Sequence, residues 1–265
     1  MKIKRILLTG DDGYNSIGTR LLVHFLKNKY DLNIVATKIQ QSGVGGKLSI
    51  KEGGQWGKVQ VDGVPALWVS GTPGDAMELA NTYFKKSFDL VLSGINLGPN
   101  IVGDLASGTF TAAVRAIKLR LAPKAIAFSW VAPASFWYHD HLGNEDLATY
   151  STYPGAAAYK LINLAIANNF WDNYLLNINF PDQPTKEAKF TRFAYYFGDF
   201  FRPLKLDKTK QAYSYPKGFY PELKGFINTD ADALRSNYIS ITPCKPDLLN
   251  DQSFQALKGQ VITLS

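Results

Sequence analysis

The chain has 265 residues, and 46% of them are hydrophobic, so it can bury a large core as one domain or as one domain with an appendage. The formal charge is +7, but the basic residues are scattered and form no basic stripe, so nucleic acid is not expected as the main partner. No apolar run approaches the about 20 residues of a membrane-spanning helix, and no secretory pattern follows the basic start. The single cysteine, Cys244, excludes an intramolecular disulfide and favours a cytoplasmic protein.

As far as residue 180, short β-branched runs alternate with helical patterns, which is typical of βαβ units and predicts an α/β fold with a parallel sheet. The expected elements are a strand at 5–9, a helix at 18–29, a strand at 33–36, paired strands at 58–61 and 66–69, a helix at 73–84, a strand at 90–93, a helix at 109–120, a strand at 125–129, a helix at 154–167 and a strand at 174–179. Asp62-Gly63 between the paired strands supplies the positive φ of a hairpin turn.

Beyond Pro181 the pattern changes, because aromatic residues and prolines crowd together without a helical period. We therefore expect a Rossmann-like catalytic domain over residues 1–185 and a C-terminal extension over residues 186–265 that carries an oligomerisation arm. A strand is expected at 238–242 within this extension.

The first polar loop, Gly10-Asp11-Asp12-Gly13, directly follows the first expected strand. Two adjacent carboxylates repel one another, so a cation that both coordinate would compensate them. Hard oxygen ligands favour Mg²⁺ or Mn²⁺ over zinc. The alternative is an ordinary turn, in which Asp and Gly are common and Asp caps the following helix.

Three further polar segments follow strands or open a helix. Ser42 lies in the glycine-rich loop 40–46, and Asn96 lies in the loop after the strand at 90–93. Ser107-Gly108-Thr109 precedes a helix, whose free N–H groups and positive dipole end suit a phosphate. Each segment alone could be a plain turn or a helix cap. Because loops after parallel strands emerge at one sheet edge, together they indicate a metal and phosphate site.

These motifs resemble those of the SurE family, the stationary-phase survival nucleotidases, over nearly the whole chain. The matching segments are Asp11-Asp12-Gly13, Ser42-Gly43, Gly71-Thr72-Pro73-Gly74-Asp75, Ser93-Gly94-Ile95-Asn96-Leu97-Gly98-Pro99-Asn100, Ser107-Gly108-Thr109, Asn177-Ile178-Asn179-Phe180-Pro181, Thr229-Asp230 and Tyr238-Ile239-Ser240-Ile241-Thr242-Pro243. The string from Ser93 to Asn100 is the most specific of them.

The resemblance implies a Rossmann-like three-layer sandwich with a mostly parallel sheet and an extended, β-rich C-terminal arm, swapped within homodimers or homotetramers. It also implies metal-dependent release of phosphate from nucleoside 5′- and 3′-monophosphates, as in an acid phosphatase. One Mg²⁺ or Mn²⁺ ion per subunit would be held by Asp11, Asp12, Ser42 and Asn96. The implied catalytic residues are Asp11, Asp12 and Asn96, and the implied phosphate-binding residues are Gly43, Ser107, Gly108 and Thr109.

Three positions depart from the family pattern. Gly10 replaces the Asn that normally precedes the Asp pair, Arg115 lies where the helix usually carries an acidic residue, and Thr37-Lys38 stands where Pro-Asp is usual. The missing Asn side chain would weaken contacts to the phosphate, so the departures bear on turnover more than on metal binding.

Our mechanistic hypothesis is that a metal-activated water at the Asp11-Asp12 site attacks phosphorus, while the 107–109 segment holds the phosphate oxygens. Direct attack by Asp11 is a rival. The alternatives outside nucleotide hydrolysis are a non-catalytic homologue that binds nucleotide and metal, and a phosphatase for another small phosphate ester or polyphosphate. The only other polar cluster, His139-Asp140-His141, is expected to be an exposed loop rather than a metal site.

Overall fold

The computed structural model describes residues 2–103, 105–171, 174–194, 203–215 and 228–245, together with Gln255 and Lys258. Its main sheet has nine strands in the order β3-β4-β2-β1-β5-β6-β7-β11-β8. The strands are β1 (Arg5–Thr9), β2 (Asp31–Thr37), β3 (Trp56–Val61), β4 (Val64–Val69), β5 (Leu90–Leu97), β6 (Ala125–Trp130), β7 (Leu175–Phe180), β8 (Ala188–Phe190) and β11 (Ile239–Cys244).

Six adjacent strands of the sheet run parallel to one another, in the spatial order β4, β2, β1, β5, β6 and β7. At the two ends of this series, β3 pairs antiparallel with β4 and β11 pairs antiparallel with β7. The hairpin between β3 and β4 turns at Asp62 and Gly63, both with positive φ, as the sequence predicts. The parallel strands β5, β6 and β7 are buried throughout, because helices cover both faces of the sheet.

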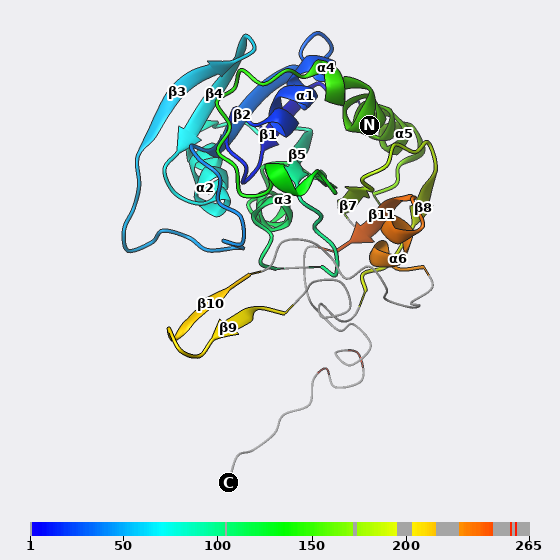
Figure 1. The fold of residues 1–265 in the computed structure, drawn as a ribbon. Coiled ribbons are helices and arrows are strands. Elements are labelled where there is room, and N and C mark those ends of the chain that lie inside the picture. The colour runs from blue at the N-terminus through cyan, green and yellow to red at the C-terminus, as the bar shows by residue number, and fades with distance from the viewer. Residues whose placement is uncertain are drawn as a thin grey trace.

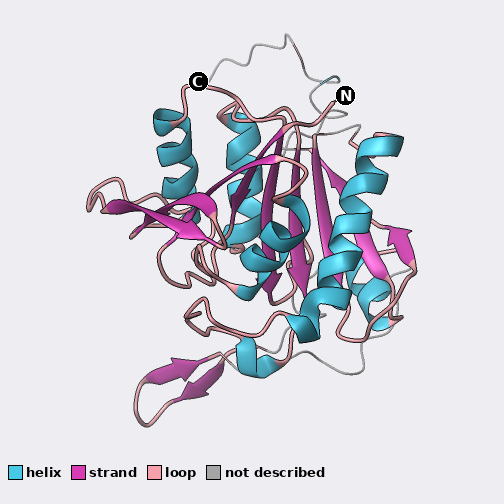
Figure 2. Ribbon diagram, turned by 90° about the horizontal axis from the view of Figure 1, so that it is seen from above, coloured by secondary structure: helices cyan, strands magenta, loops and turns pink. Residues whose placement is uncertain are grey.

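The helices form the two outer layers (Figures 1 and 2). They are α1 (Ile17–Leu26), α2 (Pro73–Tyr83), α3 (Gly108–Lys118), α4 (Ala148–Tyr150), α5 (Ala157–Asn168) and α6 (Asp230–Arg235), with single turns η1 (Ala134–Phe136) and η2 (Ser151–Ala156). Alternate side chains of β1 face opposite layers: Ile6 and Leu8 pack in the core that includes α1 and α5, and Leu7 packs in the core that includes α2 and α3. The three-layer α/β sandwich is therefore confirmed.

Some boundaries differ from those predicted. The first helix ends at Leu26 rather than residue 29, and the helix predicted from Pro154 begins at Ala157. Pro154 lies inside η2, directly after Tyr153, whose extended backbone interrupts the helix. The strand predicted at 90–93 continues to Leu97, with a register shift against β6 between Ser93 and Asn96. This longer strand carries Asn96 inside the sheet rather than in a loop.

The C-terminal region contributes to the main sheet. The strand predicted at 238–242 is β11, which pairs with β7, and β8 pairs with β11 in parallel at the sheet edge. A separate hairpin of β9 (Lys205–Asp207) and β10 (Ala212–Ser214) projects from the body in Figure 1. The predicted division at residue 185 stays a prediction, and strands from both sides of it share one sheet.

The aromatic segments predicted to lie in the arm at 195–197 and 216–220 fall outside the described residues. Within the described part of the chain, none of the helices combines the length and the apolar character that a membrane crossing needs.

Candidate functional site

The Asp11-Asp12 pair follows the carboxyl end of β1 and is buried, with 3% of Asp11 and 8% of Asp12 exposed. The loop after β2 reaches the pair, because the backbone N–H of Gln41 donates to the carbonyl of Asp11 at 2.7 Å. Further along that loop, the N–H of Gly45 donates to the carbonyl of Ala106 at 2.8 Å. The loops after β1 and β2 and the segment before α3 therefore converge, as the sequence predicts for one edge of a parallel sheet.

Asp11 lies against the first turn of α3. The Thr109 hydroxyl donates to Asp11 Oδ1, and a Cβ added to Gly108 would come within 2.8 Å of Asp11 Oδ2. Ser107 caps the helix, since its hydroxyl accepts from the Phe110 N–H at 2.9 Å. The structure thus brings the 107–109 segment to the site. It also shows that the fully buried Thr109 side chain contacts Asp11, so this hydroxyl fixes a carboxylate.

Asp12 is held from the neighbouring strand, because the Leu97 N–H donates to Asp12 Oδ2 at 2.8 Å. Burial raises the pKa of Asp12, and the negative charge of Asp11 raises it further. Burial also raises the pKa of Asp11, against hydrogen bonds from Thr109 and Gly108 that favour its ionised form. Ionisation of both carboxyl groups therefore costs free energy, and a bound cation would offset this cost.

Asn96 presents a carboxamide oxygen without a partner. Its Nδ2 donates to the carbonyl of Gly98 at 2.6 Å, which fixes the direction of the amide. Its Oδ1 is buried and accepts no hydrogen bond from the described residues. A buried acceptor left unsatisfied costs free energy and calls for an explanation. A ligand at the site would supply one.

Ser42 and Gly43 lie on the exposed part of the loop after β2. Gly43 has a φ of +76°, and a Cβ added there would meet nothing within 4 Å, so its backbone borders open space. The same loop is anchored to α2: Asp75 accepts from the Ser49 N–H at 3.0 Å and from the Thr72 N–H at 2.8 Å. The Gly71–Asp75 motif therefore builds a capping box that anchors the loop carrying Ser42.

The donors of this site suit a hard divalent cation. The residues expected as donors are two carboxylates, the amide oxygen of Asn96 and the hydroxyl of Ser42, which is exposed on the loop after β2. The described residues contain no group of three or more His, Cys, Asp or Glu side chains that could hold a metal.

The expectation of an exposed loop at 139–141 is wrong for His141, which is 8% exposed. Its carbonyl accepts from Asn15 Nδ2 at 3.0 Å, and its Nδ1 lies 3.4 Å from Glu145 Oε1. Burial lowers the pKa of His141. Asp140 Oδ1 accepts from the Gln40 N–H at 3.3 Å, so this segment packs on the loops after β1 and β2. The contacts with Asn15 and Gln40 join residues 100 or more positions apart, so local sequence patterns give no signal for them.

The three departures have different structural settings. A Cβ at Gly10 would meet Gly94 N at 3.5 Å, an ordinary contact, so a larger residue fits at its first atom. Arg115 Nε donates to Glu78 Oε1 at 2.8 Å and links α3 to α2. Thr37 Oγ1 donates to the Asp11 carbonyl at 3.4 Å. Arg115 thus serves the helix pair, while Gly10 and Thr37 adjoin the site.

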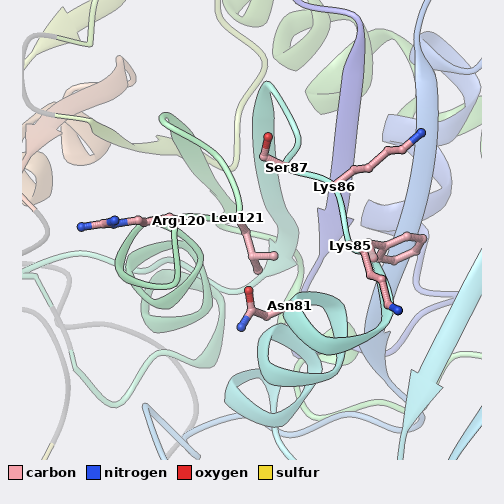
Figure 3. Close-up of a pocket in the computed structure, with 7 residues that line it drawn as sticks. Asn81, Lys85, Lys86, Ser87, Arg120 and Leu121 are labelled. Atoms are coloured by element: carbon pink, nitrogen blue, oxygen red, sulfur yellow. The ribbon is translucent and has the colours of Figure 1, made fainter.

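The hollow shown in Figure 3 lies elsewhere, at the amino edge of the sheet. It measures about 240 Å³ and is lined by Asn81, Phe84, Lys85, Lys86, Ser87, Arg120 and Leu121. These residues end α2 and α3 and precede β5 and β6, whereas the site described above follows β1 and β5. The hollow is therefore not part of the candidate site.

Comparison with known proteins identifies the family of the chain. Residues 6–197 match the family described as survival protein SurE. The chain is 31% identical to the 5′-nucleotidase SurE of Archaeoglobus fulgidus and 30% identical to the 5′/3′-nucleotidase SurE of Wigglesworthia glossinidia brevipalpis, covering 96% of each chain in both cases. The SurE protein structure from Aquifex aeolicus superposes with a TM-score of 0.72 at 27% identity, over 96% of this chain and 98% of that one. The chain therefore belongs to the SurE family.

Proposed function

We propose that this chain is a metal-dependent phosphomonoesterase that releases phosphate from nucleoside 5′- and 3′-monophosphates. The family and its relatives named as 5′- and 5′/3′-nucleotidases support this activity. The observation that carries the site is the buried Asp11-Asp12 pair, together with an Asn96 oxygen on the neighbouring strand β5 that accepts no hydrogen bond from the described residues. We assign one Mg²⁺ or Mn²⁺ ion per subunit to Asp11, Asp12, Ser42 and Asn96.

In this proposal the protein supplies position and charge compensation, which phosphoryl transfer needs more than covalent chemistry. When bound, the cation would offset the negative charge of the phosphate and lower the pKa of a water molecule. Asp11 or Asp12 orients that water and accepts its proton. The water oxygen forms a bond to phosphorus, the ester P–O bond breaks, and the nucleoside leaves as an alcohol after taking up a proton.

The remaining site residues have supporting roles. Gly43, Ser107 and Gly108 would contact the phosphate oxygens through the loop after β2 and the start of α3. Thr109 acts through Asp11, whose carboxylate its hydroxyl binds. The Leu97 N–H does the same for Asp12. Both carboxylates are therefore oriented before any ligand arrives, as catalytic positioning requires.

Phosphate release tests the activity. Purified protein is incubated with a panel of 5′- and 3′-nucleoside monophosphates, p-nitrophenyl phosphate and polyphosphate, in Mn²⁺, in Mg²⁺ or in EDTA. We expect metal-dependent release that EDTA abolishes, with nucleotides as the preferred substrates. If none of the substrates shows EDTA-sensitive phosphate release, the proposed enzymatic activity is wrong. If p-nitrophenyl phosphate or polyphosphate is hydrolysed faster than every nucleotide, the assignment of nucleoside monophosphates as substrates is wrong.

Gly10 favours a second candidate, a family member that binds nucleotide and metal without turnover. The position lacks the side chain that the family places beside the Asp pair, while Asp11, Asp12 and Asn96 are retained. The two candidates differ in one measurement: the non-catalytic protein would bind a nucleoside monophosphate in the presence of Mn²⁺ and return it intact.

We also propose that the chain acts in the cytoplasm as a homodimer or homotetramer joined through its C-terminal arm. The β9–β10 hairpin supports an assembly role, because its side chains are exposed and include Leu206 at 68% and Tyr213 at 68%. Light scattering of the full chain and of a Leu206→Ser, Tyr213→Ser variant tests this. An unchanged mass for a multimeric wild type would remove the hairpin from the interface.

A further inference from the structure

The loop after β5 is clamped by side chains of β7. The carbonyl of Asn100 accepts from Asn177 Nδ2 at 2.7 Å and from Asn179 Nδ2 at 3.1 Å, and the Asn100 N–H donates to Asn179 Oδ1 at 2.8 Å. Both β7 asparagines are fully buried. Their buried amides therefore satisfy both backbone groups of the half-buried Asn100, and leaving a buried amide unsatisfied would be costly.

The clamp is connected to Asn96 through only three residues. Pro99 precedes Asn100 and has a fixed φ, and it also restricts the backbone of Gly98. Fixing Asn100 thus limits where the Gly98 carbonyl can point. That carbonyl accepts from Asn96 Nδ2, which leaves Asn96 Oδ1 as the free end of the amide.

We propose that Asn177 and Asn179 are positioning residues for the reaction, which hold the Asn100 backbone so that the Asn96 carboxamide oxygen stays directed at the cation. This rests on the proposed function, since it takes Asn96 as a metal ligand. The β7 asparagines touch neither substrate nor metal. They act through the Asn100 backbone on the Gly98 carbonyl, which is the direct partner of Asn96. Loss of a direct partner typically weakens metal affinity about 10- to 100-fold, so the lower end of this range is expected for the β7 asparagines.

Two substitutions and one matched control separate this role from general packing. Asn179→Asp and Asn177→Asp keep the side-chain size but lose the N–H that the Asn100 carbonyl accepts. Ser240 is the control, because it lies opposite Asn179 on β11, is fully buried, and has a hydroxyl with no hydrogen-bond partner among the described residues. Ser240→Ala should therefore leave metal binding unchanged.

The main readout is the dissociation constant for Mn²⁺, measured by titration calorimetry on the full chain without substrate. We expect both Asn→Asp variants to weaken Mn²⁺ binding by about tenfold, the lower end of the range for direct partners of a ligand. At saturating Mn²⁺ their KM for nucleotide should stay within about twofold of wild type, because only the metal ligand has moved. Wild-type Mn²⁺ affinity in folded Asn→Asp variants would overturn the proposal.

Hydrogen exchange of the wild-type chain covers the case in which these variants do not fold. If the clamp and the metal ligand are coupled, Mn²⁺ should slow exchange of the backbone amides of Gly98 and Asn100, since Pro99 between them has no N–H. Unchanged exchange there at saturating Mn²⁺ would also overturn the proposal. Failure of the proposed metal site itself would give a different result. In that case Asn96→Ala and Asp12→Asn would bind Mn²⁺ as tightly as the wild type does.

Discussion

The two edges of the central sheet carry opposite charge in different surroundings. At the carboxyl edge, Asp11 and Asp12 are buried, and the neighbouring strand β5 carries the Asn96 amide oxygen, which accepts no hydrogen bond from the described residues. At the amino edge, Lys85, Lys86 and Arg120 line a hollow and are exposed. Solvent and the helix C-termini there compensate the cations, whereas the buried carboxylates accept hydrogen bonds from the Thr109 hydroxyl and the Leu97 N–H. Burial of the carboxylates, rather than net charge, is therefore our reason for proposing the carboxyl edge as the functional one.

The largest expected effect is that of Asp12→Asn at the carboxyl edge. The substitution removes one of two proposed carboxylate ligands while the Asn oxygen can still accept the Leu97 N–H. We expect phosphate release to fall by at least about a hundredfold, the upper end of what loss of an outer partner causes. Circular dichroism should show an unchanged fold. Full activity in a folded variant would remove the Asp pair from the mechanism.

The second effect concerns stability and pH in EDTA. A carboxyl whose pKa is raised on folding stabilises the protein fully below its unfolded pKa, and this contribution is lost as the pH rises through the raised value. Burial and the charge of Asp11 raise the pKa of Asp12. Between about pH 5 and pH 8, the wild type should therefore lose more stability than Asp12→Asn. Denaturant titrations at both pH values measure the difference, and parallel losses in the two proteins would contradict it.

A smaller effect is expected from Gly10→Asn, which restores the residue typical of the family. The first atom of the new side chain fits, because a Cβ there meets Gly94 N at 3.5 Å. One added hydrogen bond to a charged phosphate is worth about 1.5 kcal/mol or more, or roughly tenfold in kcat/KM. Mn²⁺ affinity should not change. A loss of activity in a folded variant would show that this chain uses the space at Gly10 differently.

The smallest effect is expected at the amino edge. Lys85→Gln, Lys86→Gln and Arg120→Gln together remove three cations from the hollow in Figure 3. We expect kcat/KM for nucleotide to stay within about twofold of wild type, because exposed charges far along the sheet are screened by salt. Assays at low and at physiological ionic strength measure this. A large loss of activity at both ionic strengths would indicate that the substrate binds at the amino edge and would contradict the site at Asp11 and Asp12.

The sequence predicts the parallel sheet well, because its β-branched runs directly record burial between two helical layers. Convergence of the Asp11, Ser42 and Ser107 loops follows from the same reasoning. The position of Asn96 inside β5 does not, since the register shift after Ser93 depends on packing against β6. Thr109 contacts Asp11, which lies 98 positions away in the chain. His141 is buried against Asn15, which lies 126 positions away. Such distant contacts leave no local pattern.

The proposed metal site can be tested most directly by titrating the metal-free chain with Mn²⁺ in a calorimeter, beside Asn96→Ala and Asp12→Asn. If Asp11, Asp12 and Asn96 hold the ion, the wild type should bind one Mn²⁺ per subunit and both variants should bind it much more weakly. Equal Mn²⁺ affinity in all three folded proteins, or no binding to the wild type, would contradict the site.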